Sequence, residues 1–123
     1  MARTYCQVAG IVLLAVGVLG FVWPGIPGVL SINEPAEIAL HLVTGILATA
    51  AGFAGGYGRW SVLYAQVFGV IYILLGVLGF VVPDLPVGIH LDIGCNVVHL
   101  VLGVWGIWAG FFAGEARTSL AGA

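Results

Sequence analysis

Apolar residues run along this chain in four long segments, separated by short stretches rich in glycine, proline and polar residues. The segments cover about residues 4–23, 36–55, 60–82 and 93–113. Each is close to the ~20 residues that an α-helix needs to cross the hydrocarbon core of a bilayer. A transmembrane β-barrel would show alternating apolar and polar positions, whereas these runs are continuous. The pattern therefore predicts four transmembrane helices.

The stretches between the segments contain residues that end or begin helices. Prolines at both ends of 24–27 and of 83–86 follow the first and third segments. Proline ends a helix because it lacks the backbone donor and clashes with the preceding turn. The glycine-rich stretch 55–58 separates the second segment from the third. Asn33 is a candidate N-cap for the second helix, and Asp92 takes the equivalent place before the fourth.

The two halves of the chain carry the same sequence pattern. The segment GVLGFVWP at 17–24 returns fifty-nine residues later as GVLGFVVP at 76–83. Past one deleted residue, HLVTG at 41–45 returns as HLVLG at 99–103. A sequence that is one unit written twice is read first as a structural repeat.

Each copy of the repeat contains two predicted crossings, over about 4–55 and 60–113. Both copies then enter the membrane in the same sense, which makes them parallel repeats about an axis along the membrane normal. We therefore predict an all-α fold, an integral membrane four-helix bundle built from two tandem helical hairpins. Residues 1–123 would form a single transmembrane domain.

Charge is scarce and unevenly placed. Only 7% of the residues are charged, against about 25% in ordinary soluble domains, so composition excludes that class and predicts a lipid bilayer as the surroundings. The net charge of −2 gives no reason to expect nucleic acid as a partner. Arg3, Arg59 and Arg117 all fall on one side of a four-pass chain. The positive-inside rule then places both termini in the cytoplasm.

Small residues recur on one face of each predicted helix, at spacings of three, four and seven. The one notable polar residue of each helix lies on the same stripe. Small residues let transmembrane helices approach closely, so we expect these stripes to form the interior of the bundle. They are Gln7, Gly10 and Gly17; His41, Gly45, Ala48 and Gly52; Gln66, Gly69 and Gly76; and His99, Gly103, Gly106 and Gly110.

His41 and His99 are the candidate functional residues. Each lies about 9 Å inside its helix at 1.5 Å per residue, and ionisable residues inside a membrane are functional candidates. Three interpretations stay open. The imidazoles could hydrogen-bond to a backbone carbonyl, Thr44 or Asn96; they could be axial ligands of a haem or of (bacterio)chlorophyll; or they could relay protons or ions. For Gln7 and Gln66, the simplest expectation is a hydrogen bond to each other across the pseudo-two-fold axis.

Other chemistry finds little support in the sequence. His90 and the acidic residues near it lack the spacing of a metal site. The chain shows no nucleophile–base arrangement, phosphate-binding loop or paired carboxylate, so an enzyme is not expected.

Three segments carry a resemblance to a known family: ARTYCQVAG at 2–10, GVLGF at 76–80, and NVVHL at 96–100, which is followed by Gly103. They resemble a family of small four-pass bacterial membrane proteins, a domain of unknown function with an Asn-x-x-His-Leu motif opening its last helix. The first repeat departs from this motif, with Ile38 where the second has Asn96. The resemblance implies the four-pass architecture and a bacterial cytoplasmic (inner) membrane. It implies no activity.

The leading functional hypothesis is a non-enzymatic accessory subunit that packs against larger integral membrane proteins, with a homo-oligomer as a further arrangement. The alternative is a tetrapyrrole-binding component for electron transfer or light harvesting that uses His41, His99 or both. A small transporter or channel is a third hypothesis, which closely packed glycine stripes make less favourable.

Overall fold

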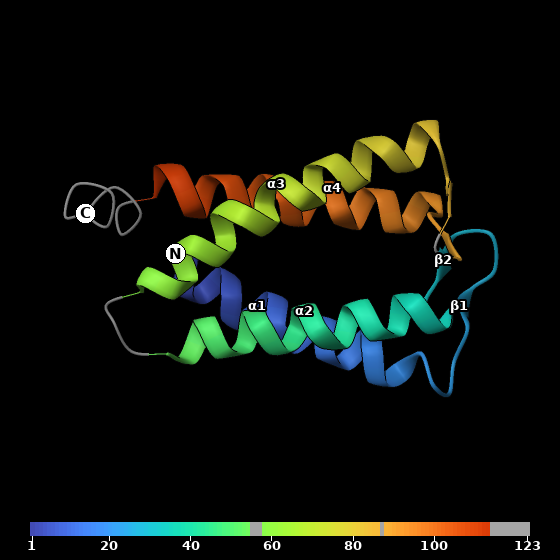
Figure 1. Ribbon diagram of the computed structural model, residues 1–123, viewed down its shortest axis with the longest axis horizontal. Helices are drawn as coiled ribbons and strands as arrows, with labels where there is room; N and C mark the ends of the chain where they lie inside the picture. Colours follow the sequence, from blue (N-terminus) through green and yellow to red (C-terminus); the bar gives the residue numbers. More distant parts are fainter. Residues whose placement is uncertain (55–57, 87, 114–123) are drawn as a thin grey trace.

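The computed structural model describes residues 1–54, 58–86 and 88–113, and its framework is all helical. Each of the four long helices, the last with its terminal turn, is long and apolar enough to cross a membrane. They run lengthwise beside one another (Figure 1). The helices are α1 (Ala2–Leu19), α2 (Pro35–Phe53), α3 (Arg59–Val81) and α4 (Ile93–Ile107), and α4 continues as the π-helical turn η1 (Trp108–Phe112).

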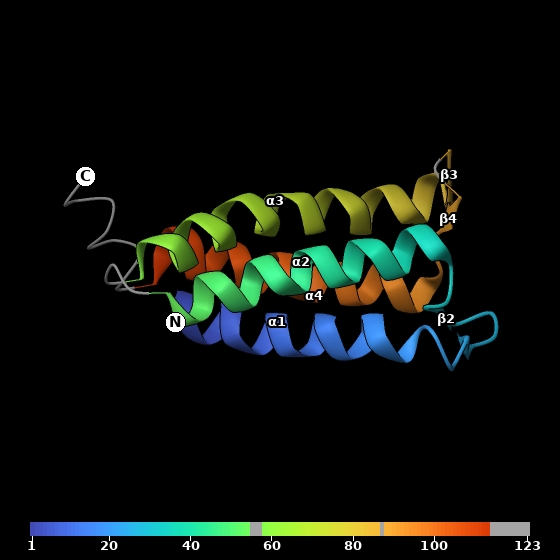
Figure 2. The same ribbon diagram turned by 60° about the horizontal axis from the view of Figure 1, so that its bottom comes forward.

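The helices associate as two hairpins. α1 packs along α2 and α3 packs along α4, while α1 and α2 both touch α3. Figures 1 and 2 show the two pairs side by side, with the connections 20–34 and 82–92 gathered at one end, called here the hairpin end. The start of α1 and the end of η1 lie at the opposite end.

Tyr5 joins the two pairs. Its side chain is fully buried, and its hydroxyl donates to the carbonyl oxygen of Leu102 at 3.0 Å. Its ring meets Trp105 edge-on at 5.0 Å between centroids and lies 6.4 Å from the Tyr64 ring. A buried aromatic body with a satisfied hydroxyl contributes both packing and orientation.

Each connection at the hairpin end contains a small antiparallel β-hairpin, which the sequence analysis did not predict. β1 (Gly25–Ile26) pairs with β2 (Leu30–Ser31), and β3 (Asp84–Leu85) pairs with β4 (Ile89–His90). Gly25, Gly28 and Gly88 have positive φ, a conformation that glycine adopts without the steric cost of a Cβ.

Hydrogen bonds from two backbone amides help to tie the helix pairs together at this end. The amide of Gly94 donates to the carbonyl of Val29 at 2.7 Å, and the amide of His90 donates to Glu34 Oε2 at 2.8 Å.

Several helix boundaries differ from the sequence-based prediction. α1 ends at Leu19 and not at Trp23, because the chain tightens into turns in which the amide of Phe21 bonds three residues back, to Val18. The N-cap of α2 is Glu34 and not Asn33. Asp92 is the N-cap of α4, but its carboxylate makes no capping hydrogen bond. Gly55, the predicted end of the second helix, and Arg117 lie outside the described residues.

Candidate functional site

His41 on α2 and His99 on α4 line the same cavity. It holds about 280 Å³ and lies between α2, α3 and α4, toward the hairpin end, and Leu13 of α1 also contributes to its lining. Leu85, Ile89 and Leu91, from the connection that carries β3 and β4, line it as well. We call it the histidine cavity. The two residues singled out from the sequence therefore share one space, to which all four helices and one connection contribute.

The walls of the histidine cavity are mostly apolar. Of the thirteen lining residues in the described part of the chain, eight are aliphatic or phenylalanine, and the polar ones are Glu37, His41, Thr44, Tyr72 and His99. The Tyr72 ring lies flat against the His99 ring, with centroids 5.9 Å apart and planes 5° from parallel. An apolar space with a few convergent polar groups is the usual form of a small-molecule site.

Three buried polar atoms of this cavity have no hydrogen-bond partner among the described residues: Glu37 Oε2, His41 Nδ1 and His99 Nδ1. Glu37 is only 5% exposed, and its other oxygen accepts a hydrogen bond from Cys95 Sγ at 3.7 Å. Leaving a buried polar group unsatisfied costs about 1–3 kcal/mol. The expected bonds from the imidazoles to a carbonyl, Thr44 or Asn96 are not made within this part of the chain.

A second, larger hollow lies beside the histidine cavity, toward the opposite end. This α2–α3 groove holds about 440 Å³ and is lined by α2 from Leu47 to Ala54 and by α3 from Trp60 to Phe68. Phe68 lines both spaces. Leu47 and Leu63 are each 48% exposed, so the groove faces outward from the bundle. The two spaces therefore adjoin at Phe68, the histidine cavity with polar groups in its lining and the groove with a mostly apolar lining.

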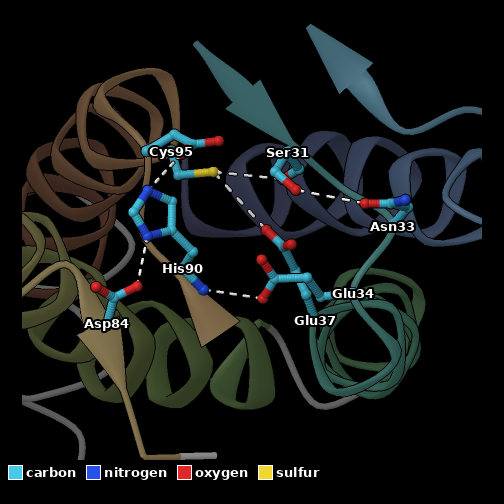
Figure 3. A network of polar contacts seen from close by, with 8 residues as sticks. Ser31, Asn33, Glu34, Glu37, Asp84, His90 and Cys95 are labelled. Carbon is cyan, nitrogen blue, oxygen red and sulfur yellow. Dashed lines mark hydrogen bonds and ion pairs between the residues drawn. The ribbon is translucent and has the colours of Figure 1, made fainter. Parts of the chain in front are cut away.

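A separate polar network lies at the hairpin end, around His90 (Figure 3). Its Nδ1 is 2.6 Å from Asp84 Oδ1 and its Nε2 is 2.9 Å from Asp92 Oδ1. The hydrogen bond with Asp84, helped by the charges of Asp84, Asp92 and Glu34, raises the pKa of His90. The Asp92 carboxylate thus turns to His90 and not to the helix amides. Among the described residues, no group of three or more His, Cys, Asp or Glu side chains is placed to hold a metal ion.

The nine glycines expected to mediate packing all lie against a neighbouring helix. A Cβ built on Gly45 would lie 2.9 Å from the Leu14 nitrogen, and one on Gly103 would lie 2.7 Å from the Ile73 nitrogen. Such close backbone approach is possible only without a side chain. The others in contact are Gly10, Gly17, Gly52, Gly69, Gly76, Gly106 and Gly110.

Gln7 and Gln66 do not pair with each other. Gln7 Nε2 donates to the carbonyl of Gly52 at 3.0 Å, and Gln66 Nε2 donates to the carbonyl of Gly110 at 2.8 Å. Each glutamine therefore makes its hydrogen bond within its own helix pair, because the facing glycine brings its own backbone carbonyl within reach.

Sequence reasoning missed Glu37 and Tyr72 as members of the site. Glu37 was not singled out from the sequence, although it precedes His41 by four residues and so shares its face. That spacing is a signal the sequence does contain. Tyr72 gave no such signal, since its place against His99 depends on how α3 meets α4.

Comparison of this chain with protein-family models, with curated proteins and with solved structures gives no match.

Proposed function

We propose that this protein is a non-enzymatic accessory component of the bacterial cytoplasmic membrane that holds a lipid-soluble ligand along the α2–α3 interface. The observation that carries the proposal is the convergence of three orphaned polar atoms, on Glu37, His41 and His99, in one apolar-walled cavity. These atoms are themselves covered by protein, so a bound molecule with polar groups at one end would satisfy them once the three side chains turn toward it, and the adjoining α2–α3 groove would take its apolar part.

The proposed setting follows from the sequence. The two hairpins are proposed to be parallel repeats, and both termini are proposed to lie in the cytoplasm, which places the histidine cavity in the extracytoplasmic half of the bilayer. The resemblance at 96–100 supports the bacterial inner membrane. An accessory role alongside larger membrane subunits is supported by the large apolar side chains that the described helices expose, such as Leu74, Val101 and Val104.

Access from the bilayer is supported by the exposure of the lining residues. Leu40 and Ile71 line the histidine cavity and are 52% and 38% exposed. They stand on α2 and α3, so the mouth of the cavity is between these helices and faces the lipid. A ligand would therefore enter sideways from the membrane.

Solvent extraction of the protein purified in a mild detergent from bacterial membranes tests the binding role. We expect a small lipid-soluble molecule to co-purify at a fixed ratio to the wild-type chain. Ala50→Trp fills the α2–α3 groove and should remove the molecule, because Ala50 lines that groove. Ala15→Trp is the matched control, since Ala15 is also an exposed alanine but on α1. Equal retention by both variants, or no molecule in the wild type, would count against the proposal.

Native gel analysis of the same material tests the accessory role. Migration with a larger membrane protein is the expected result, and migration only as a monomer or homo-oligomer would contradict it.

A tetrapyrrole remains a second candidate ligand because His41 and His99 line one cavity. Metal-ligating histidines usually donate their other ring N–H to an orienting acceptor. Neither Nδ1 has such an acceptor among the described residues, which makes a tetrapyrrole the less favoured ligand. An absorption spectrum of the extracted material distinguishes a tetrapyrrole from other ligands by its Soret or chlorophyll band.

A further inference from the structure

The contents of the histidine cavity can be narrowed by its volume and its wall chemistry. Water occupies about 30 Å³ per molecule and needs two to four polar partners, so about 280 Å³ would call for roughly nine waters. The walls offer three orphaned atoms and are otherwise largely apolar. Water alone therefore does not satisfy this space, and an organic molecule does.

The charge of the lining residues further limits the class of molecule that the cavity could bind. Among the described residues, no lysine or arginine lines the histidine cavity, and Glu37 is the one acidic residue in its lining. A phosphate head group would meet no cation there and would be repelled by an ionised Glu37. A ligand that fits this lining would have a neutral head group with hydrogen-bonding atoms within reach of two imidazoles and a carboxyl group.

The aromatic lining favours a flat ring. Phe68 and Tyr72, both of which line the cavity, lie 6.0 Å apart between centroids with their planes tilted by 46°, and the Tyr72 ring stacks on His99. Aromatic faces bind planar rings by offset stacking. The volume is near the lower limit of the ~300–1,000 Å³ found for small-molecule sites, which suits one or two fused rings better than a four-ring macrocycle.

The α2–α3 groove indicates that the ligand also has an elongated apolar part. It extends along α3 from Phe68 to Trp60, eight residues or about 12 Å at 1.5 Å per residue. Because Phe68 lines both spaces, they adjoin at this residue, and an apolar chain attached to a ring in the cavity would pass Phe68 to enter the groove.

We propose that the ligand is an isoprenoid quinone or its quinol, with the ring in the histidine cavity and the tail in the α2–α3 groove. His41 and His99 hydrogen-bond to the oxygens of the ring, and Glu37 accepts a hydrogen bond from a quinol hydroxyl. The inference rests on the proposed function, since it names the class of the lipid-soluble ligand. It concerns binding and not turnover.

The test uses the full chain in lipid nanodiscs, with decylubiquinone as the probe and decylbenzene as the control for the tail alone. Decylubiquinone should raise the unfolding midpoint, with a rise that grows with the logarithm of its concentration above the dissociation constant, and decylbenzene should leave the midpoint unchanged. An equal rise with decylbenzene would overturn the assignment, because the ring oxygens would then contribute nothing.

Two histidine variants separate binding from folding. His41→Leu and His99→Leu each remove an orphaned atom, so without quinone their unfolding midpoints should equal or exceed that of the wild type. Each should bind decylubiquinone about tenfold more weakly, since one hydrogen bond to the ring is lost. Gln66→Leu, whose amide bonds to Gly110 outside the cavity, is the matched control and should keep wild-type affinity. Unchanged affinity in both histidine variants would overturn the proposal.

The failure of this inference can be told from failure of the proposed function. If the extraction experiment yields a different lipid-soluble molecule that Ala50→Trp removes, the binding role stands and the quinone assignment is wrong. If no molecule co-purifies and decylubiquinone does not bind, both are wrong.

Discussion

Gln7 on α1 donates a hydrogen bond to the carbonyl oxygen of Gly52 on α2 at 3.0 Å. Fifty-nine residues further along the sequence, Gln66 on α3 makes the same kind of bond to Gly110 of η1 at 2.8 Å. In both places the absence of a side chain on the glycine lets the carbonyl come close. A Cβ on Gly52 would lie 2.9 Å from the backbone nitrogen of Gln7, and one on Gly110 would lie 2.7 Å from the backbone nitrogen of Gln66.

This geometry predicts that Gly110 contributes more to the stability of the fold than the Gln66 hydrogen bond does. Gly110→Ala places a methyl group against the backbone of Gln66, and overpacking of this kind costs about 1–3 kcal/mol. Gln66→Leu removes the bond but keeps the close approach, and hydrogen bonds between membrane helices average about 0.6 kcal/mol. Reversible unfolding in mixed micelles, followed by circular dichroism, should show the larger loss for Gly110→Ala. A larger loss for Gln66→Leu would contradict this account.

The helices and their packing faces could be predicted because both depend on short-range spacing. The glycines from Gly10 to Gly110 repeat at helical intervals, and a helix face can be read from one helix at a time. The shared cavity could not be predicted in this way. It depends on how the two helix pairs stack, which rests on contacts such as Tyr5 to Leu102, ninety-seven residues apart.

The β-hairpins were missed for a related reason. The prolines at 24–27 and 83–86 were interpreted only as helix ends, although each stretch is followed within two residues by a glycine with positive φ, Gly28 or Gly88. Proline and glycine so close together also indicate a turn.

Asn96 occupies a place that suits an apolar residue better. Its side chain is 2% exposed, its Oδ1 has no partner among the described residues, and it packs on Gly79. At the equivalent place in the first half of the chain, Ile38 packs on Gly20. We therefore expect Asn96→Ile to raise the free energy of unfolding by about 1–3 kcal/mol, the cost of one unsatisfied buried polar group.

Chemical unfolding in detergent measures this change, with Asn96→Ala as the comparison. The alanine also removes the orphaned oxygen but leaves a void, so its gain should be smaller or absent. A loss of stability for Asn96→Ile would mean that the amide has a role the described contacts do not explain.

The His90 network predicts a pH-dependent stability. The folded state raises the pKa of His90 through its hydrogen bond with Asp84 and the nearby carboxylates, so folding favours the protonated ring. The stabilisation from the protonated His90 ring is fully present below the unfolded-state pKa of about 6.5. It is lost as the pH rises through the higher pKa that His90 has in the folded state. The unfolding midpoint should therefore fall across this window, and it should fall less in His90→Asn, which cannot titrate.

Nuclear magnetic resonance titration of the His90 ring checks the cause directly. The ring should titrate above 6.5, and Asp84→Asn should move its pKa down toward that value because it removes the largest contribution. A pKa at or below 6.5 in the wild type would contradict the geometry in Figure 3.

The proposed orientation in the membrane can be tested by cysteine labelling. In a background with Cys6→Ala and Cys95→Ala, we introduce single reporters at two exposed positions, Val29→Cys in the first β-hairpin connection and Arg59→Cys at the start of α3. Because the arginines mark the cytoplasmic side, a membrane-impermeant maleimide should label the Val29 position in intact cells. It should reach the Arg59 position only after the cells are permeabilised. The reverse pattern would place both termini outside, and labelling of both positions in intact cells would mean that α2 does not cross the membrane.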